Sequence, residues 1–598
     1  MPSVVSTPWP PASRTIRRVS SPAGQEGRGG GSGARVVFWI FALLALGVGF
    51  ISAARWRWIC DDAFITFRYL DHLLAGQGLV YNIGERVEGY SHFLWLLLLA
   101  GLRAAGLELV SASQALGLAA DAATLALWIW FSLRLGRSTA LLPLTALCLA
   151  ANYDQRLWAT GGLETSAFTL LISVLYLTLV FGSRSRRAYA AVGLLLALIF
   201  LLRPDGALFY PLTVAILLWR DRFESRRGLL ALHAPLALIL APYLLWKIVY
   251  FGQLLPNTAF AKEAGGSNLG QGLHYLGLYL RAYPSTLLAP ISIVLLLSWR
   301  RASSGLRPAL IASSFFAVYL ALFVVRVGGD FMFARFIVPI VPLVYATIEI
   351  SARQFLGPRP IALLCALLAL PGAVWAERAL RDSIYFDAAG APRATFGPSG
   401  VTDEHWYWSH LDRGKNLIER YEEIGGGLAE LFEGTDVRVV IGGQASLAYY
   451  ARFATAIESN GLTDAYIARL PVARRGRPGH EKVAPIDYLR ARGVHFEFMK
   501  RPRSHEPYRR AAFQAGAADE WIPAYVVTYD RDLMRDLATR SPHSVQLVDF
   551  EAYLDDWFTR APGRPLVELR RESQDFQVFY FERNDDPVRL AKLEALLR

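Results

Sequence analysis

The chain is short of charge, of cysteine and of any basic stripe, and each shortage excludes a class of protein. Charged residues make up 19% of its 598 residues and hydrophobic residues 54%, whereas a soluble domain averages about 25% charged and about 45–50% apolar. A single soluble globule is therefore excluded. Cys60, Cys148 and Cys365 stand far apart, so they predict neither a disulfide framework nor a zinc site.

The positive net charge does not mark a nucleic-acid-binding protein. The net charge of +12 comes largely from arginines placed between apolar runs, which is where cytoplasmic loops of membrane proteins carry them. A recognised nucleic-acid-binding motif is lacking as well. The composition predicts a polytopic membrane protein that is surrounded by membrane lipid and has no nucleic-acid partner.

Three regions of different composition follow one another. Residues 1–35 are rich in Pro, Gly, Ser and Arg and predict a disordered cytoplasmic tail. Residues 36–376 are a succession of apolar runs and predict an α-helical transmembrane domain. Residues 377–598 have ordinary charge and predict a soluble α/β domain. Strands are expected in it at 437–443, 493–499, 524–530 and 576–584.

The apolar runs predict about eleven transmembrane helices. The first covers residues 36–54 and follows several arginines, which places the tail in the cytoplasm. A secretory signal cleaved after Ala54 is the alternative. The other ten are expected at 112–133, 138–152, 166–181, 188–202, 207–219, 229–249, 285–299, 309–325, 336–350 and 360–376.

The apolar run at residues 91–106 decides the topology. It is short for a span and ends in Arg103 and Gly106, so we interpret it as an outer-surface or re-entrant helix. Every Arg-rich joint then lies in the cytoplasm, as the positive-inside rule requires. The 377–598 domain is accordingly predicted to be extracytoplasmic.

The joint after the first span carries adjacent carboxylates. Asp61 and Asp62 begin a predicted amphipathic helix, 62–75, that we expect to lie on the membrane interface. One carboxylate can take the proton of an acceptor hydroxyl, while the other orients a hydroxyl or holds a divalent cation against phosphate. Helix capping is the alternative, but a cap accounts for one aspartate and not for two.

The other joints on the same predicted face carry polar phrases with Gly and Pro. Two further phrases lie in the soluble domain. The phrases are GGLET (161–165), LLRPDG (201–206), FGQLLPNTAFAK (251–262), VGGDFMFARFIVP (327–339), GLTDAYIAR (461–469) and GHEK (479–482). Acidic residues in them can bind hydroxyl groups or a metal, or cap the helices that follow.

Together with DDAFITFRYLDHLLAGQGLVYNIGERVEGYSHFLW (61–95), this ordered set resembles the polytopic GT-C glycosyltransferases. The most similar family is that of the terminal β-(1→2)-arabinofuranosyltransferases of mycobacterial cell-wall synthesis and their broader bacterial relatives. The resemblance covers about residues 40–500. It implies a catalytic aspartate in the first outer loop and a donor sugar on polyprenyl phosphate. Asp61 or Asp62 is then the candidate base, and the spacing does not decide between them.

The resemblance also implies partners for the two substrates. A lipid-phosphate donor needs cations on the same face, and the candidates are Lys262, Arg203, Arg335 and Arg68. Interaction of these side chains with lipid headgroups is the alternative. Contacts to sugar and acceptor are expected from Glu88, His92, Glu164, Asp330, His480 and Lys482.

These inferences predict a membrane glycosyltransferase of the bacterial inner membrane. It would transfer a sugar, arabinofuranose being one candidate, from polyprenyl phosphate to an extracytoplasmic cell-envelope glycan. The alternative is a non-catalytic polytopic envelope protein or a transporter, because some relatives are linked to motility control. A transporter buries charges at mid-span, whereas the predicted spans are almost free of them. Metal and cofactor, a divalent cation included, stay undetermined.

Overall fold

A computed structural model describes most of the chain. The described residues are 30–135, 142–221, 226–263, 266–298, 303–356, 360–368, 400–410, 414–472, 477–498, 506–516 and 520–598. Most of the predicted cytoplasmic tail and the predicted domain boundary at 376 and 377 lie outside these ranges. The predicted helix at 360–376 is described as helical over 360–368.

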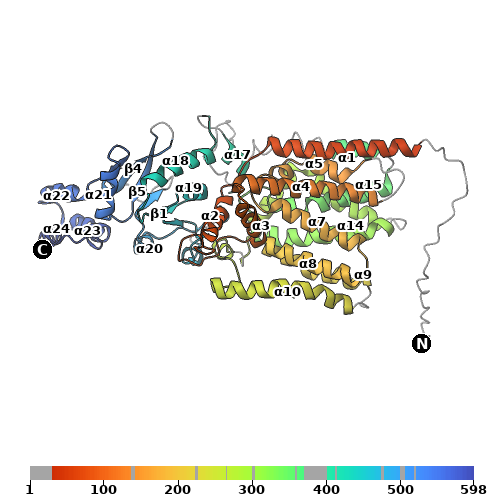
Figure 1. The fold of residues 1–598 in the computed structure, drawn as a ribbon, viewed down its shortest axis with the longest axis horizontal. Helices are drawn as coiled ribbons and strands as arrows, with labels where there is room; N and C mark the ends of the chain where they lie inside the picture. Colours follow the sequence, from red (N-terminus) through yellow and green to blue (C-terminus); the bar gives the residue numbers. More distant parts are fainter. Residues whose placement is uncertain are drawn as a thin grey trace, which may run out of the picture.

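Long apolar helices form a bundle at one end of the molecule, and a sheet with its covering helices forms the other end (Figure 1). Short helices lie between the two parts. The bundle helices are α1 (Gly30–Arg55), α4 (Leu109–Arg134), α5 (Leu144–Ala151), α7 (Thr165–Phe181), α8 (Arg186–Leu202), α9 (Phe209–Asp221), α10 (Arg226–Phe251), α13 (Leu288–Ser298), α14 (Ser303–Tyr319) and α15 (Val341–Phe355). The connecting elements are α2 (Ala63–Leu74), α3 (Phe93–Ala104), α6 (Tyr153–Leu157), η1 (Pro204–Leu208), α11 (Asn257–Ala261), α12 (Leu269–Ala282), η2 (Pro284–Leu287), the π-helix η3 (Leu320–Val325) and η4 (Val338–Ile340).

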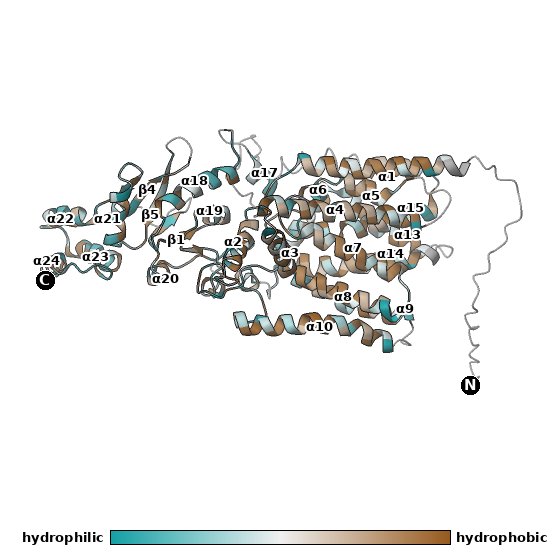
Figure 2. Ribbon diagram, in the orientation of Figure 1, coloured by the Kyte–Doolittle hydropathy of each residue, from teal (hydrophilic) through white to brown (hydrophobic). Residues whose placement is uncertain are grey.

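Four helices of the described chain are each long and apolar enough to cross a membrane alone. They are the segments Gly33–Arg55, Leu109–Arg134, Arg227–Phe251 and Gly305–Val325. A fifth is counted if α12 and η2–α13, which bend by 104° at Tyr283, act as one span. In Figure 2 hydrophobic residues predominate along the bundle helices, and hydrophilic residues are more frequent in the helices of the sheet part.

The helices pack closely where glycine brings two backbones together. A Cβ atom on Gly193 of α8 would lie 1.9 Å from the carbonyl oxygen of Leu232 in α10. A Cβ atom on Gly117 of α4 would lie 2.3 Å from the carbonyl oxygen of Ala159. Because a backbone atom cannot move aside as a side chain can, these two glycines fix the spacing of α8 from α10 and of α4 from the loop after α6.

The bundle is not as free of charge as the sequence predicts. Asp121 of α4 forms a buried ion pair with Arg156 of α6. Glu349 of α15 pairs with Arg353 at 2.6 Å and accepts hydrogen bonds from Ser132 Oγ and the amide of Thr145. Each carboxylate thus has a guanidinium partner, which is the condition for burying charge away from water.

The second part of the molecule is built on one six-stranded sheet with the order β2-β1-β3-β5-β4-β6. The strands β1, β2 and β3 are parallel, and β5, β4 and β6 continue the sheet in antiparallel pairs. The strands are β1 (Arg438–Ile441), β2 (Thr455–Glu458), β3 (Phe496–Phe498), β4 (Arg510–Gln514), β5 (Trp521–Val526) and β6 (Val545–Leu547). The helices are α17 (Glu404–Ser409), α18 (Leu417–Leu431), α19 (Ala445–Tyr450), α20 (Ile486–Ala491), α21 (Arg531–Arg540), α22 (Phe550–Arg560), α23 (Leu566–Phe576) and α24 (Pro587–Leu597), with the short turns η6 (Ile467–Arg469), η7 (Pro507–Arg509) and the π-helix η8 (Gln577–Phe581).

The strand predicted at 576–584 is wrong, because this segment ends α23 and forms the π-helix η8. Phe576, Phe579 and Tyr580 are buried together, and their spacing of three and four residues is that of one helix face. A short aromatic run does not separate strand from helix by periodicity. The strands β1, β3 and β5 overlap the other three predicted strands, whereas β2, β4 and β6 were not predicted.

The predicted helix after Asp62 is present as α2, but its expected place on the membrane surface is wrong. All residues from Ala63 to Leu70 are buried, because α2 lies between the connecting helix α3 and α19 of the sheet part. Asn82, farther along the same loop, exchanges two hydrogen bonds with the backbone of Ala456 in edge strand β2. The first loop is therefore held between the two parts of the molecule.

Candidate active site

A cavity of about 440 Å³ opens where the motif-bearing joints meet, between the end of the bundle and the sheet part. It lies beside α2, α11, η1 and the loop that follows η3. Seven of the predicted site residues line it: Asp62, His92, Glu164, Arg203, Lys262, Asp330 and Arg335. Residues from five separate joints thus share one site.

The two adjacent aspartates have different surroundings. The carboxylate of Asp61 accepts hydrogen bonds from the amide of Ala445 at 2.8 Å and from the amide and hydroxyl of Ser446. Asp61 therefore holds the beginning of α19. Asp62 lines the cavity and makes no side-chain capping bond to α2, so the capping alternative does not account for it.

The electrostatic setting of Asp62 suits a base. Burial raises the pKa of Asp62 above its usual value, while the positive charges of Lys262 and Arg335 oppose that rise. A carboxyl whose pKa is raised is a stronger proton acceptor in its ionised form. The side chain can therefore accept a proton from a molecule bound in the cavity.

Glu164 is the centre of a buried charge cluster in the cavity wall. Its Oε1 lies 3.3 Å from Nη1 of Arg203 and 3.2 Å from Nη2 of Arg335, and its Oε2 lies 3.4 Å from Nδ1 of His92. Burial alone would raise the pKa of Glu164, but Arg335, His92 and Arg203 together lower it to about 2. The carboxylate is therefore ionised and holds two guanidinium groups in place. Like Asp62, it makes no side-chain capping bond to the helix it precedes.

The loop after η3 brings Asp330 to the cavity between two cations. Asp330 lies 3.7 Å from Nη1 of Arg335 and 4.0 Å from Nζ of Lys262. Gly329, with φ of +74°, lets the loop pass so close to Tyr275 that a Cβ atom would lie 2.5 Å from its ring. Glycine in the VGGDF phrase thus avoids a steric clash that a larger residue would cause.

Five of the predicted site residues do not line the cavity. Arg68 donates hydrogen bonds to the carbonyls of Tyr81, Ala448 and Phe453, and Lys482 donates to the carbonyls of Phe260 and Ala468. Glu88 pairs with Lys247 at 2.9 Å. Asp61 binds α19, as described above, and His480 packs edge-on against Phe331 with ring centroids 4.7 Å apart. These contacts place Arg68, Lys482, Glu88 and Asp61 in the framework around the site.

Sequence reasoning missed several charged residues at or near the cavity, among them Arg326, Glu404 and Arg477. Arg326 lines it directly after η3, and its position at the end of an apolar run was the available signal. Glu404 pairs with Arg477 at 3.0 Å, and burial raises the pKa of Glu404 to about 8 against the effect of Arg477. The guanidinium of Arg477 lies 4.3 Å from the ring centroid of Phe331. No sequence pattern connects these two residues with the bundle loops.

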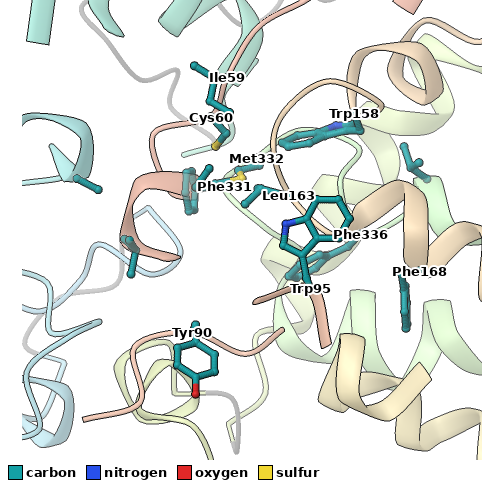
Figure 3. Packing of buried hydrophobic residues seen from close by; sticks show 14 of the residues in the cluster. Ile59, Cys60, Tyr90, Trp95, Trp158, Leu163, Phe168, Phe331, Met332 and Phe336 are labelled. Atoms are coloured by element: carbon teal, nitrogen blue, oxygen red, sulfur yellow. The ribbon is translucent and has the colours of Figure 1, made fainter. Parts of the chain in front are cut away.

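An apolar layer backs the charged residues. Figure 3 shows Leu163, Phe331, Met332 and Phe336 near Trp95 and Trp158 at the junction of the two parts. The indole nitrogens of Trp95 and Trp158 donate hydrogen bonds to the carbonyls of Gly162 and Phe333. The loops that carry Glu164 and Arg335 are therefore fixed by packing as well as by charge.

The cavity does not offer the ligand set of a metal ion. Within the ranges that the structure describes, no three His, Cys, Asp or Glu side chains are grouped as ligands would be. Asp62 and Asp330 both have cations as close neighbours. We therefore derive no chemical step through a metal.

Comparisons with known proteins agree with the resemblance found in the loop phrases. The chain is 31% identical over 341 residues to the terminal β-(1→2)-arabinofuranosyltransferase of Mycobacterium tuberculosis, which covers 50% of this chain and 53% of the relative. It is 29% identical over 380 residues to the enzyme of the same name from Corynebacterium glutamicum, covering 56% of this chain and 54% of the relative. The match thus spans about half the length of these two relatives. No protein-family model matches the chain.

The solved structure of ArnT in the apo state has a similar fold. The chain is similar to ArnT from Cupriavidus metallidurans in the apo state, with a TM-score of 0.51 and 16% identity over 82% of this chain and 98% of ArnT. ArnT bound to undecaprenyl phosphate gives a TM-score of 0.48 over 71% of this chain and 86% of ArnT. The resemblance predicted from the sequence is confirmed: the chain has the fold of ArnT, a GT-C glycosyltransferase, and is similar in sequence to terminal β-(1→2)-arabinofuranosyltransferases.

Proposed function

We propose that the protein is a membrane glycosyltransferase that transfers a sugar from polyprenyl phosphate to a cell-envelope glycan. The observation that carries this proposal is the single cavity in which a carboxylate, Asp62, faces the same space as Lys262, Arg326 and Arg335. Apolar side chains, including Leu255, line the same cavity. A donor with a sugar, a phosphate and a hydrocarbon chain fits that combination of surfaces. The similarity to arabinofuranosyltransferases makes arabinofuranose the first sugar to test.

In the proposed reaction, Asp62 acts as the general base. An acceptor hydroxyl attacks the anomeric carbon of the donor and gives its proton to the carboxylate of Asp62. The bond between the anomeric carbon and the phosphate oxygen breaks, and polyprenyl phosphate leaves with the bonding electrons. Neighbouring cations stabilise the negative charge on the leaving phosphate. In this scheme Asp62, and not Asp61, is the catalytic residue.

The cations of the cavity fall into two groups. Arg203 is held by Glu164 and by Asp205, at 3.3 and 3.0 Å, and Arg335 is held by Glu164 and Asp330. Lys262 lies 4.0 Å from the carboxylate of Asp330, a longer distance than those of the Arg203 pairs. Arg326 has an exposed side chain at the cavity. We therefore assign the donor phosphate to Lys262 and Arg326, and the positioning of Glu164 to Arg203 and Arg335.

Replacing Lys262 or Arg326 by glutamine is expected to weaken use of the donor. Each change removes a charge-assisted hydrogen bond to phosphate, so kcat/KM for the donor should fall about tenfold to one hundredfold, the equivalent of roughly 1.5–3 kcal/mol. The measurement is transfer of radiolabelled arabinofuranose from polyprenyl phosphate to an envelope glycan by the purified protein. The same sugar on a nucleotide serves as the alternative donor.

Arg281→Gln is the matched control for this pair, because Arg281 is an exposed cation on α12 that does not line the cavity. It should leave kcat/KM unchanged. Equal effects of all three variants would contradict the assignment of the phosphate site. Transfer from the nucleotide sugar, with none from polyprenyl phosphate, would contradict the proposed function itself.

We also propose that eleven segments cross the membrane and that the sheet part lies outside the cytoplasm. Support comes from contacts between joints: Glu164 joins the GGLET, LLRPDG and VGGDF loops at one end of the bundle. At the other end, Arg184 donates to the carbonyl of Arg220, and Arg353 donates to the carbonyl of Leu142. The basic joints thus contact each other and do not contact the cavity. The positive-inside rule places these joints in the cytoplasm.

A pair of reporter fusions tests this topology. A phosphatase that is active only outside the cytoplasm should be active when fused after Ser409, beyond α17, and inactive when fused after Ser183, between α7 and α8. The reverse pattern would show that the orientation is inverted. Activity at both positions would contradict the number of spans.

A further inference from the structure

A cluster of three arginines around one carboxylate lies at the end of the bundle opposite the cavity. It consists of Arg184 before α8, Arg220 and Asp221 at the end of α9, and Arg307 in α14. We call it the α9 basic cluster. The elements before α9 line the cavity through Pro204 and Leu208, and α9 itself extends about 20 Å from there at 1.5 Å per residue. Figure 1 shows α9 at the end of the bundle away from the sheet.

Asp221 is the hub of the cluster and is fully engaged. Its Oδ1 lies 3.0 Å from Nε of Arg184 and 3.0 Å from Nε of Arg220. Its Oδ2 accepts a hydrogen bond from Nη2 of Arg220 at 3.1 Å and another from the hydroxyl of Tyr189. One negative charge therefore faces three positive charges, which leaves a net charge of about +2 in a small volume at a helix end.

Within the described part of the chain, Arg307 is the arginine of the cluster that forms no ion pair with Asp221, which pairs with Arg184 and Arg220. Its guanidinium lies 5.2 Å from the ring centroid of Trp219. Its Nη2 is buried and has no hydrogen-bond partner among the described residues. Arg220 and Arg184 each repel it more strongly than Asp221 attracts it. A buried donor without a partner is costly, and an anion placed between Arg307, Arg220 and Arg184 would satisfy it.

The surroundings indicate where such an anion would come from. Trp219 is 55% exposed and Leu230, near the beginning of α10, is 72% exposed. An exposed tryptophan at the end of an apolar helix is typical of the depth at which lipid headgroups lie. Figure 2 shows hydrophilic residues gathered at the end of α9 beside these apolar helices. The arginines suit a phosphate group, and the exposed apolar residues around them suit a lipid.

We propose that the α9 basic cluster binds the phosphodiester headgroup of an anionic phospholipid, with Arg307 as the residue that selects for negative charge. Basic pockets between transmembrane helices bind such headgroups in other membrane proteins. The site is separate from the cavity and does not depend on the proposed transferase activity. Its effect is to tie the ends of α8, α9 and α14 to the surrounding leaflet.

Thermal unfolding of the full-length protein in a zwitterionic detergent tests the proposal. Phosphatidylglycerol, phosphatidylcholine or inorganic phosphate is added in increasing amounts. Ligand that binds only the folded state raises the midpoint in a saturable way. We expect a saturable rise with phosphatidylglycerol and none with the other two. A similar rise with phosphatidylcholine, or a saturable rise with inorganic phosphate, would overturn the assignment to an anionic lipid.

Arg307→Gln should weaken the apparent affinity for phosphatidylglycerol about tenfold or more, since it removes one charge-assisted contact. Arg134→Gln is the matched control, because Arg134 also lies over an indole, 5.1 Å from Trp130, at the end of α4. It should keep the full response. If Arg307→Gln does not fold, Arg184→Gln is measured instead, because this side chain is 65% exposed. An unchanged response in the variant that folds would refute the proposal.

Discussion

Replacing Asp62 by asparagine is expected to lower the rate of sugar transfer by about 10²- to 10⁴-fold, the contribution typical of a positioned general base. The amide cannot take the proton of the acceptor hydroxyl, while its shape leaves the cavity unchanged. The measurement is single-turnover transfer from polyprenyl-phosphate arabinofuranose by purified protein. Thermal unfolding should show a midpoint close to that of the unchanged protein, because the Asp62 side chain makes no capping bond to α2 that the change could remove.

Asp61→Asn separates the neighbouring residue from this role. The Asp61 carboxylate accepts hydrogen bonds from two amides and a hydroxyl of α19. In asparagine, an NH2 group replaces one of the carboxylate oxygens and would face these N–H and O–H donors. A loss of about 1–3 kcal/mol in stability is expected, with a smaller loss of transfer than in Asp62→Asn. A folded, inactive Asp61→Asn together with an active Asp62→Asn would assign the base to Asp61 and refute the proposed mechanism.

The pH dependence of transfer gives an independent readout of Asp62. A base must be ionised, so the rate should rise with pH through the pKa of Asp62, which burial raises above its usual value. Lys262 opposes that rise. Lys262→Gln should therefore move the acidic limb of the profile to higher pH, whereas Arg281→Gln should leave it in place. If the acidic limb of the Lys262→Gln profile stayed in place, Lys262 would not be acting on the pKa of the base.

Replacing Glu164 by glutamine is expected to have the largest effect on stability. Glu164 lies within 3.3 Å of both Arg203 and Arg335, and its loss leaves two buried guanidinium groups without their shared charge. Removing one partner of a buried ion pair costs about 3–5 kcal/mol. The measurement is the free energy of unfolding in mixed micelles. Glu430→Gln, on the exposed side of α18, is the control and should change little.

The effect of Glu164 should also depend on pH in a defined direction. Its pKa in the folded protein is about 2, below the ordinary value of 4.5. The stabilisation is therefore complete above pH 4.5 and is lost as the pH falls toward 2. The unchanged protein and Glu164→Gln should become more alike in stability over that range. A constant difference between them down to pH 2 would contradict an ionised Glu164 at the centre of the cluster.

Much of the bundle could be predicted because transmembrane helices depend on local composition. The apolar runs at 112–133, 166–181, 188–202 and 229–249 all lie within helices of the bundle. The strand predicted at 576–584 failed for the opposite reason: aromatic residues in a short run fit either a sheet or a helix face, and packing decides. The fold of the sheet part depends on contacts between distant residues, which a single sequence does not record.

The candidate site was predicted in part for a similar reason. Asp62, Lys262 and Arg335 stand in loop phrases that a resemblance can identify, and the structure brings them to one cavity. The difference between Asp61 and Asp62 arises from Ala445 and Ser446, almost 400 residues away, and no spacing within the loop reveals it. Arg68 was predicted to bind the donor phosphate and Lys482 to bind the sugar or acceptor, but backbone carbonyls of other segments accept hydrogen bonds from both side chains.

The bond between Asp61 and α19 has a consequence for biosynthesis. Asp61 is held by α19, which is synthesised after the bundle helices. The hydrogen-bond partners of Arg68 and Asn82 also belong to this later segment of the chain. During translation, a chain whose bundle helices are already inserted still lacks the contacts that hold the loop of Asp61 and Asp62. In the mechanism proposed above, such a precursor would have its membrane helices but would be inactive until the segment around α19 has folded against the loop of Asp62.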